Sequence, residues 1–171
     1  MHTNMNRAAL VLLALMIPLS LIVSGASLAA AESVTGHADF VTATGFRFSY
    51  SLSAIRHEDG SVSGQFENHV ENANTGEFVL NAHVRITCFA ISGNIARVGG
   101  VIERQTGRPL PPGITEGFIT VVDNGEGDAA SPDLASPPRV GGDGSALTQC
   151  VTGGMSLPLF PIERGNIQVQ P

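Results

Sequence analysis

The amino-acid sequence predicts an all-β protein, an antiparallel meander of seven or eight strands that closes fully or nearly into a barrel. Three observations lead to this class. Residues 46–53 alternate large apolar and polar side chains with the period of two that is typical of a β-strand. Short segments rich in Asn, Asp and Gly separate the apolar segments, as tight turns do. No segment after residue 31 has a convincing helical period. A two-sheet β-sandwich is the alternative architecture.

The first 31 residues predict a secretory signal peptide. Arg7 gives the short amino-terminal segment a positive charge, residues 8–23 are almost wholly apolar, and Ala29-Ala30-Ala31 supplies a small-residue cleavage site. An uncleaved membrane anchor is the alternative, but the apolar run is shorter than the about 20 residues that a spanning helix needs. We therefore expect a single secreted domain over residues 32–171, outside the membrane once the signal peptide is removed.

The first part of this domain predicts a β-hairpin preceded by one more strand. Residues 34–41 have a β-rich composition. In residues 46–53 the four large side chains share one face, and residues 61–70 carry Val62 and Phe66 on one face with polar side chains on the other. A turn at residues 58–60 joins these two segments and makes them antiparallel partners.

The next pair of strands is expected at residues 77–91 and 95–103. In residues 77–91 the apolar side chains share one parity, which places Cys88 in the core near the end of the strand. Gly99-Gly100 interrupts residues 95–103, and paired glycines inside a strand indicate a bulge, a bend or the close approach of another backbone. A sheet that curves into a barrel needs such a device.

The carboxyl-terminal part predicts two more strands and a long loop. Residues 115–123 carry apolar side chains on both faces, which indicates a strand that is covered on both sides. Residues 124–154 are rich in Gly, Pro, Ser and Asp and predict a loop, although residues 145–151 suit a short helix. After a short extended segment at residues 157–162, residues 166–170 form the last strand, expected beside the first.

Cys88 and Cys150 are the only cysteines. An even number of cysteines in a secreted chain favours a disulfide bond, which would tie the long loop to the barrel. Two buried free thiols are the alternative.

Composition excludes several partners. The chain has no lysine, and the segment after residue 31 has eight Arg against fifteen Asp and Glu, a formal net charge of −7. An acidic surface without a basic stripe argues against nucleic acid and anionic membranes. The absence of Trp and the single Tyr argue against a sugar-binding protein, because these amphipathic rings are common on such surfaces.

The clearest candidate site is an acidic loop with oxygen-bearing side chains. Asp123, Asn124, Glu126, Asp128 and Asp133 offer the carboxylate and amide oxygens that Ca²⁺ prefers. The spacing does not match an EF-hand, because it lacks a distal Glu. The alternative is a solvated acidic turn.

Four histidines remain after cleavage, and none forms a close pair in the sequence. They are His37, His57, His69 and His83. The favoured interpretation is that these are exposed histidines on strands and turns. The alternative is that His69 faces His83 across adjacent antiparallel strands and that such a pair binds a zinc or copper ion. The sequence contains none of the common hydrolase, metalloprotease or nucleotide-binding motifs, and we assign no catalytic residue.

Three sequence blocks carry a resemblance to other proteins. They are Cys88 followed by Gly-Asn-x-Ala at residues 93–96, Val-Asp-Asn-Gly-Glu-Gly at 122–127 with a second cysteine at Cys150, and Gly-Asn-Ile-Gln-Val at 165–169. Together they resemble a family of small secreted bacterial proteins of unknown function. The resemblance implies secretion and covers nearly the whole mature chain, but it implies no activity.

These observations predict a secreted, noncatalytic binding or surface-associated module with no cofactor apart from the calcium ion considered above. Its partner is an extracellular ligand or a cell-envelope component that meets residues 123–133, because polar loop residues on a plain scaffold often carry function. One alternative is a small enzyme that acts on a small molecule in the barrel mouth, and another is a structural protein of the cell envelope.

Overall fold

The computed structural model describes residues 31–127 and 130–171, so residues 1–30 of the expected signal peptide lie outside the described residues. Its elements are β1 (Ser33–Val41), β2 (Phe46–Arg56), β3 (Val62–Asn72), β4 (Phe78–Ser92), β5 (Ile95–Gly107), β6 (Glu116–Val122), β7 (Leu134–Ala135), β8 (Arg139–Gly141), α1 (Ser145–Thr152), β9 (Phe160–Pro161) and β10 (Arg164–Gln170). The predicted all-β class is confirmed.

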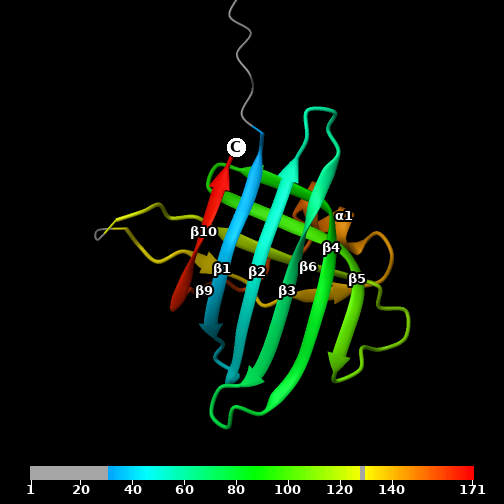
Figure 1. Cartoon of the computed structure of the whole chain (residues 1–171), viewed down its shortest axis with the longest axis vertical. Helices are drawn as coiled ribbons and strands as arrows, with labels where there is room; N and C mark the ends of the chain where they lie inside the picture. The colour runs from blue at the N-terminus through cyan, green and yellow to red at the C-terminus, as the bar shows by residue number, and fades with distance from the viewer. Residues whose placement is uncertain (1–30, 128–129) are drawn as a thin grey trace, which may run out of the picture.

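The strands form one antiparallel sheet that curls through 292° and stays open (Figure 1). Nine strands follow each other in the order β10-β1-β2-β3-β4-β5-β6-β7-β9, and β8 pairs with β6 beside this path. β1 to β6 therefore form the predicted meander, and the first and last long strands, β1 and β10, are paired as expected. The prediction of a closed or nearly closed barrel of seven or eight strands is corrected to an open half-barrel of ten strands. The two additional strands, β7 and β8, arise in the segment that was predicted to be a loop, and β9 lies in the short extended segment expected at residues 157–162.

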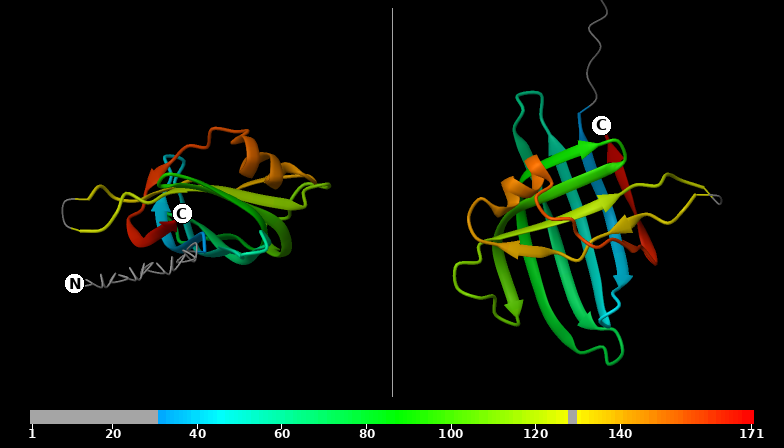
Figure 2. Two further views of the ribbon diagram at one scale, coloured as in Figure 1. Left: turned by 90° about the horizontal axis from the view of Figure 1, so that it is seen from above. Right: turned by 180° about the vertical axis from the view of Figure 1, so that it is seen from behind.

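The curl brings the last strands over the concave side of the first ones. Seen from behind, β6, β7 and β8 run across the long strands β1 to β4 (Figure 2). The side chains enclosed between them form the core, which includes Phe40, Tyr50, Phe66, Val98 and Ile119. β6 is buried on both faces, as its sequence predicted.

Alternation along β2 and β3 accounts for their place in the sheet. Tyr50, Leu52 and Ala54 are buried while Ser51 and Ser53 between them are exposed. β3 pairs with β2 in an antiparallel hairpin along its whole length, which confirms the predicted hairpin. A shift of one residue would exchange the two faces and bury the serines.

The paired glycines of β5, Gly99 and Gly100, have different roles in the curvature of the sheet. The β4–β5 register shifts between Ile86 and Cys88, opposite Gly100 and Gly99, so a bulge lies there. A Cβ atom on Gly100 would lie 1.9 Å from the carbonyl oxygen of Arg85 on β4. A Cβ atom on Gly99 would lie 2.8 Å from the Cβ of Ala146 in α1. The sequence predicted a bulge or a close backbone approach, and the structure contains both.

Gly100→Ala should lower the free energy of unfolding by about 3 kcal/mol or more, because the methyl group collides with backbone that cannot move without breaking the ladder. Urea unfolding followed by far-ultraviolet circular dichroism measures this change. Gly117→Ala is the matched control: Gly117 pairs directly with Gly100, and its Cβ would meet nothing nearer than 3.4 Å. Equal stabilities of the two variants would contradict the argument.

The segment at residues 124–154 is not the long loop that its composition predicted. It contains β7, β8 and α1, and the helix confirms the expectation of a short helix at residues 145–151. α1 begins after Gly144 and ends at Gly153, both in the left-handed conformation that glycine adopts at little cost. None of the described residues belongs to a helix with the length and apolar character needed to span a membrane.

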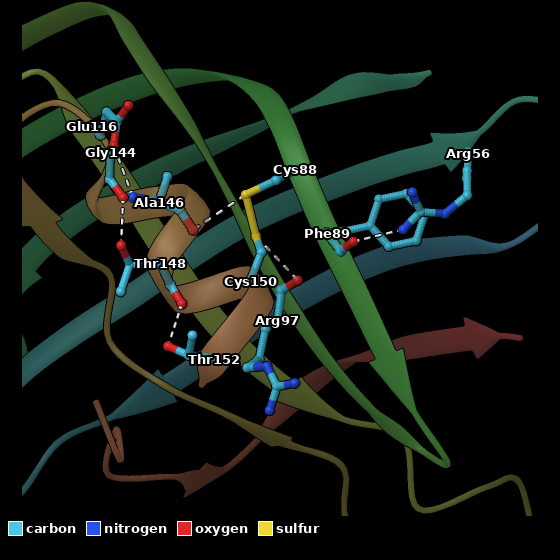
Figure 3. The surroundings of a disulfide bond; sticks show 10 residues. All are labelled: Arg56, Cys88, Phe89, Arg97, Glu116, Gly144, Ala146, Thr148, Cys150 and Thr152. Carbon is cyan, nitrogen blue, oxygen red and sulfur yellow. Dashed lines mark hydrogen bonds between the residues drawn. A yellow bond between two sulfur atoms is a disulfide. The ribbon is translucent and has the colours of Figure 1, made fainter. Parts of the chain in front are cut away.

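A disulfide bond between Cys88 and Cys150 fastens α1 to β4 (Figure 3). Two further contacts hold the helix in place. The carboxylate of Glu116 on β6 accepts a hydrogen bond from the backbone N–H of Ala146 (2.8 Å), and Ala146 packs on Gly99. The expected disulfide is confirmed, and it clamps the helix across the outside of β5.

Candidate functional site

The acidic loop joins the end of β6 to β10. The carboxylate of Asp133 accepts hydrogen bonds from the backbone N–H groups of Asn124 (2.8 Å) and Ile167 (2.8 Å). The carboxylate of Asp123 accepts them from Gly125 (2.8 Å) and Val169 (2.9 Å). Ile167 and Val169 lie two apart on β10, so their N–H groups point to the same side of the strand. The two carboxylates therefore bridge the gap between β6 and β10 where no backbone ladder closes the barrel.

The other predicted calcium ligands are spread along the same loop. The side-chain amide of Asn124 donates to the carbonyl of Pro132 (2.6 Å), and the carboxylate of Glu126 accepts from Asn166 on β10 (2.7 Å). Asp128 lies outside the described residues. Within residues 31–127 and 130–171, no group of three or more His, Cys, Asp or Glu side chains is placed to hold a metal ion. The calcium site stays a prediction from the sequence alone.

The melting temperature of the mature domain, measured in calcium and then in EDTA, tests that prediction. Each carboxylate oxygen of Asp123 and Asp133 already accepts a backbone N–H group, so we expect the same value in both. An increase of several degrees at saturating calcium would instead show an ion bound to the native state.

The histidines lie on the convex face of the sheet and in a turn, and His69 and His83 do not face each other. His69 stands opposite Asn81, and His83 stands opposite Glu67, because the register places the two histidines two residues apart. The Nδ1 atom of His69 lies 2.7 Å from the side-chain oxygen of Asn81, and His83 lies between Glu67 (3.8 Å) and Glu103 (3.6 Å). The alternative in which His69 faces His83 is wrong.

The convex face carries a broad polar hollow of about 520 Å³ around these residues. Its lining includes His37, Ser49, Glu67, Asn81 and Arg104. Two of its three histidines, His69 and His83, are hydrogen-bonded or close to a carboxylate within the face. Exposed polar side chains that bond to each other in this way are typical of a solvated sheet face, although the buried residues Tyr50 and Asn68 also reach this hollow.

A second cavity, of about 260 Å³, lies inside the half-barrel at the end where β2 begins and β3 ends. Its apolar wall includes Phe46, Phe48, Phe66, Leu80, Val84 and Ile102. Leu110 and Val140 come from the segments after β5 and within β8, so the curl of the sheet brings distant parts of the chain together here. Three polar residues, Asn68, Gln105 and Arg108, complete the lining among the described residues. Concave, mostly apolar cavities with a few polar groups are typical of small-molecule sites.

Asn68 in the cavity lining and Tyr50 beside it in the sheet each carry a buried polar atom. Asn68 on β3 is 5% exposed and stands opposite Tyr50 on β2, which is 1% exposed. In the part of the chain that the structure describes, neither the amide oxygen of Asn68 nor the hydroxyl of Tyr50 has a hydrogen-bond partner. Burial raises the pKa of Tyr50 far above its usual value, so its hydroxyl stays neutral. Unpartnered buried polar atoms are rare in native proteins.

Sequence reasoning missed this cavity, although one signal was present. Asn68 shares the parity of Phe66 and Val70 on β3, so the alternation placed a polar amide on the apolar face. Gln105 and Arg108 gave no comparable signal, because a bulge between His83 and Val84 shifts the β4–β5 register before this end of the pair.

Comparison of the chain with protein-family models, with curated proteins and with solved structures finds no match. The candidate site therefore rests on the geometry of this chain.

Proposed function

We propose that this protein is a secreted, noncatalytic binding module that holds a small, mostly apolar molecule in the cavity of its half-barrel. The observation that carries the proposal is the apolar cavity of about 260 Å³ between β2 and β8. This volume lies just below the range of about 300–1,000 Å³ for drug-sized ligands, so the ligand is smaller than these. The disulfide bond supports an oxidising compartment, in agreement with secretion.

The chemistry of the lining favours binding over catalysis. The described residues that line the cavity include no Asp, Glu, His or Cys, the side chains that most often act as acid, base or nucleophile. An enzyme in the barrel mouth was the alternative from the sequence, and it predicted titratable groups inside the cavity; among the described lining residues Arg108 is the one such group. A structural envelope protein remains the other alternative from the sequence.

The proposal also moves the binding surface away from the acidic loop. The sequence favoured residues 123–133 as the place where a partner binds. In the structure, Asp123 and Asp133 bind β10 through their carboxylates, so these two side chains attach the acidic loop to the last strand.

The affinity should be modest. A ligand that buries on the order of 200 Å² of apolar surface gains about 5 kcal/mol at about 25 cal/mol per Å². Part of this gain is lost to restricted motion of the ligand. We therefore expect dissociation constants on the order of 100 µM or weaker for simple apolar probes.

The neutral probe N-phenyl-1-naphthylamine, whose fluorescence rises in apolar surroundings, tests the proposal. Gly117 lies in the cavity wall, where a new Cβ would meet Val84 (3.4 Å) and Phe66 (3.6 Å). We expect Gly117→Ala to weaken probe binding and Gly117→Val to weaken it by about tenfold or more, because the branched side chain fills the cavity.

Ser53→Val adds the same side chain on the exposed face of β2 and should leave probe binding unchanged. The melting temperature of each variant confirms that it is folded. Undiminished probe binding by a folded Gly117→Val variant would place the probe elsewhere and reject the cavity as the site.

A further inference from the structure

The cavity has a polar band across its apolar wall. Asn68 on β3, Ala82 on β4 and Gln105 on β5 stand opposite each other in register, and all three line the cavity. On one side of this row, the neighbouring row across the three strands consists of Phe66, Val84 and Ile102. On the other side, the neighbouring row begins with Val70 and Leu80. Inward side chains of neighbouring rows are two residues, about 7 Å, apart along a strand. A ligand that fills the cavity therefore meets an amide between two apolar zones.

Asn68 is the member of this band that lacks a partner. Its side-chain oxygen has no hydrogen bond within the described residues. Tyr50, the directly opposite residue on β2, does not supply the missing donor, since its own hydroxyl is also without a partner. The amide of Gln105, by contrast, donates to the backbone carbonyl of Thr106 (3.2 Å). A buried acceptor without a hydrogen bond destabilises the folded protein. A hydrogen-bond donor on a bound ligand would supply the missing partner.

We propose that Asn68 is a specificity residue which selects small apolar alcohols over molecules of similar size that have no hydrogen-bond donor. This inference rests on the proposed binding function of the cavity. An uncharged donor is required, because no carboxylate lines the cavity among the described residues and a buried cation without a counter-charge is strongly disfavoured. A hydroxyl on an alicyclic or branched hydrocarbon meets both conditions, with the hydrocarbon in the apolar zones and the hydroxyl donating to Asn68.

Cyclohexanol and its methyl ether test this assignment, because the ether keeps the ring and the oxygen but loses the donor. Their affinities are measured by displacement of N-phenyl-1-naphthylamine. In the wild-type protein we expect the alcohol to bind about tenfold more tightly than the ether, as a donor matched to a buried acceptor does. In Asn68→Leu, which replaces the amide by an apolar side chain of similar size, the two should bind equally while the probe still binds.

Asn81→Leu is the matched control, since Asn81 is exposed on the convex face of β4 and its substitution should leave the tenfold ratio unchanged. If the probe does not bind the wild-type protein, the proposed function itself is wrong. The probe could bind while the alcohol and the ether bind the wild-type protein with equal affinity. In that case the ligand does not donate a hydrogen bond to Asn68, and only the present inference is wrong. The wild-type ratio alone decides the matter if Asn68→Leu does not fold.

Discussion

Replacing both cysteines by alanine should lower the free energy of unfolding of the mature domain by about 4 kcal/mol. Cys88 and Cys150 are 62 residues apart, and closing a loop of that length restricts the unfolded chain to about this extent in the entropy model. A domain has only about 5–15 kcal/mol of stability in total, so the loss is a large share of it.

The loss should be greatest at α1. The helix is eight residues long, too short to be stable alone in water. Cys88, Ala146 and Cys150 form a small buried cluster of their own, apart from the main core. Without the bond, the helix keeps only noncovalent contacts, among them the hydrogen bond from the Ala146 N–H to Glu116 and the packing of Ala146 on Gly99. Amide hydrogen exchange in α1 should therefore rise well before exchange in β2 and β3.

Urea unfolding of the oxidised wild-type protein and of Cys88→Ala/Cys150→Ala measures the difference. The reductant dithiothreitol is the control: it should destabilise the wild-type protein by a similar amount and leave the double variant unchanged. A loss below about 1 kcal/mol would mean that the docked helix, and not the covalent bond, restricts this segment.

The sequence could predict the strands and turns that depend on residues close together in the chain. The strands from β1 to β6 follow from the period of two in segments such as residues 46–53 and from turns at fixed places, so the meander is confirmed. The very short strands β7 and β8 carry no such signal, and β9 lies in a segment predicted only to be extended. They exist because β6 pairs with β7 and β8, and β7 in turn pairs with β9.

The candidate site depended even more on contacts distant in sequence. Acidic residues at 123–133 looked like metal ligands because their oxygens cluster in the sequence. Their actual partners, Ile167 and Val169, lie more than thirty residues further on, and no local pattern announces such a pairing. The cavity wall likewise combines β2, β5 and the segment around Val140, which only the curl of the sheet brings together. The parity of Asn68 was the single signal in the sequence.

Asp133→Ala should cost about 2–4 kcal/mol of unfolding free energy. The variant loses two hydrogen bonds to a carboxylate, each worth about 1.5–3 kcal/mol when the acceptor is charged. Ile167 is fully buried, so its N–H group is left without an acceptor and away from water. Exchange of the Ile167 and Val169 amides should accelerate, because β10 loses its link to the end of β6 while its ladder with β1 remains.

Asp143→Ala is the matched control, since that carboxylate is exposed and accepts a hydrogen bond from the Thr115 hydroxyl (2.6 Å). Its loss should change the free energy of unfolding by less than about 0.5 kcal/mol.

Carrying out both measurements in EDTA separates the two roles that Asp133 could have. A carboxylate that attaches the acidic loop to the last strand is needed whether or not calcium is present, so the loss should persist in EDTA. A calcium ligand would lose its contribution there, and Asp133→Ala would then be no less stable than the wild-type protein in the same buffer.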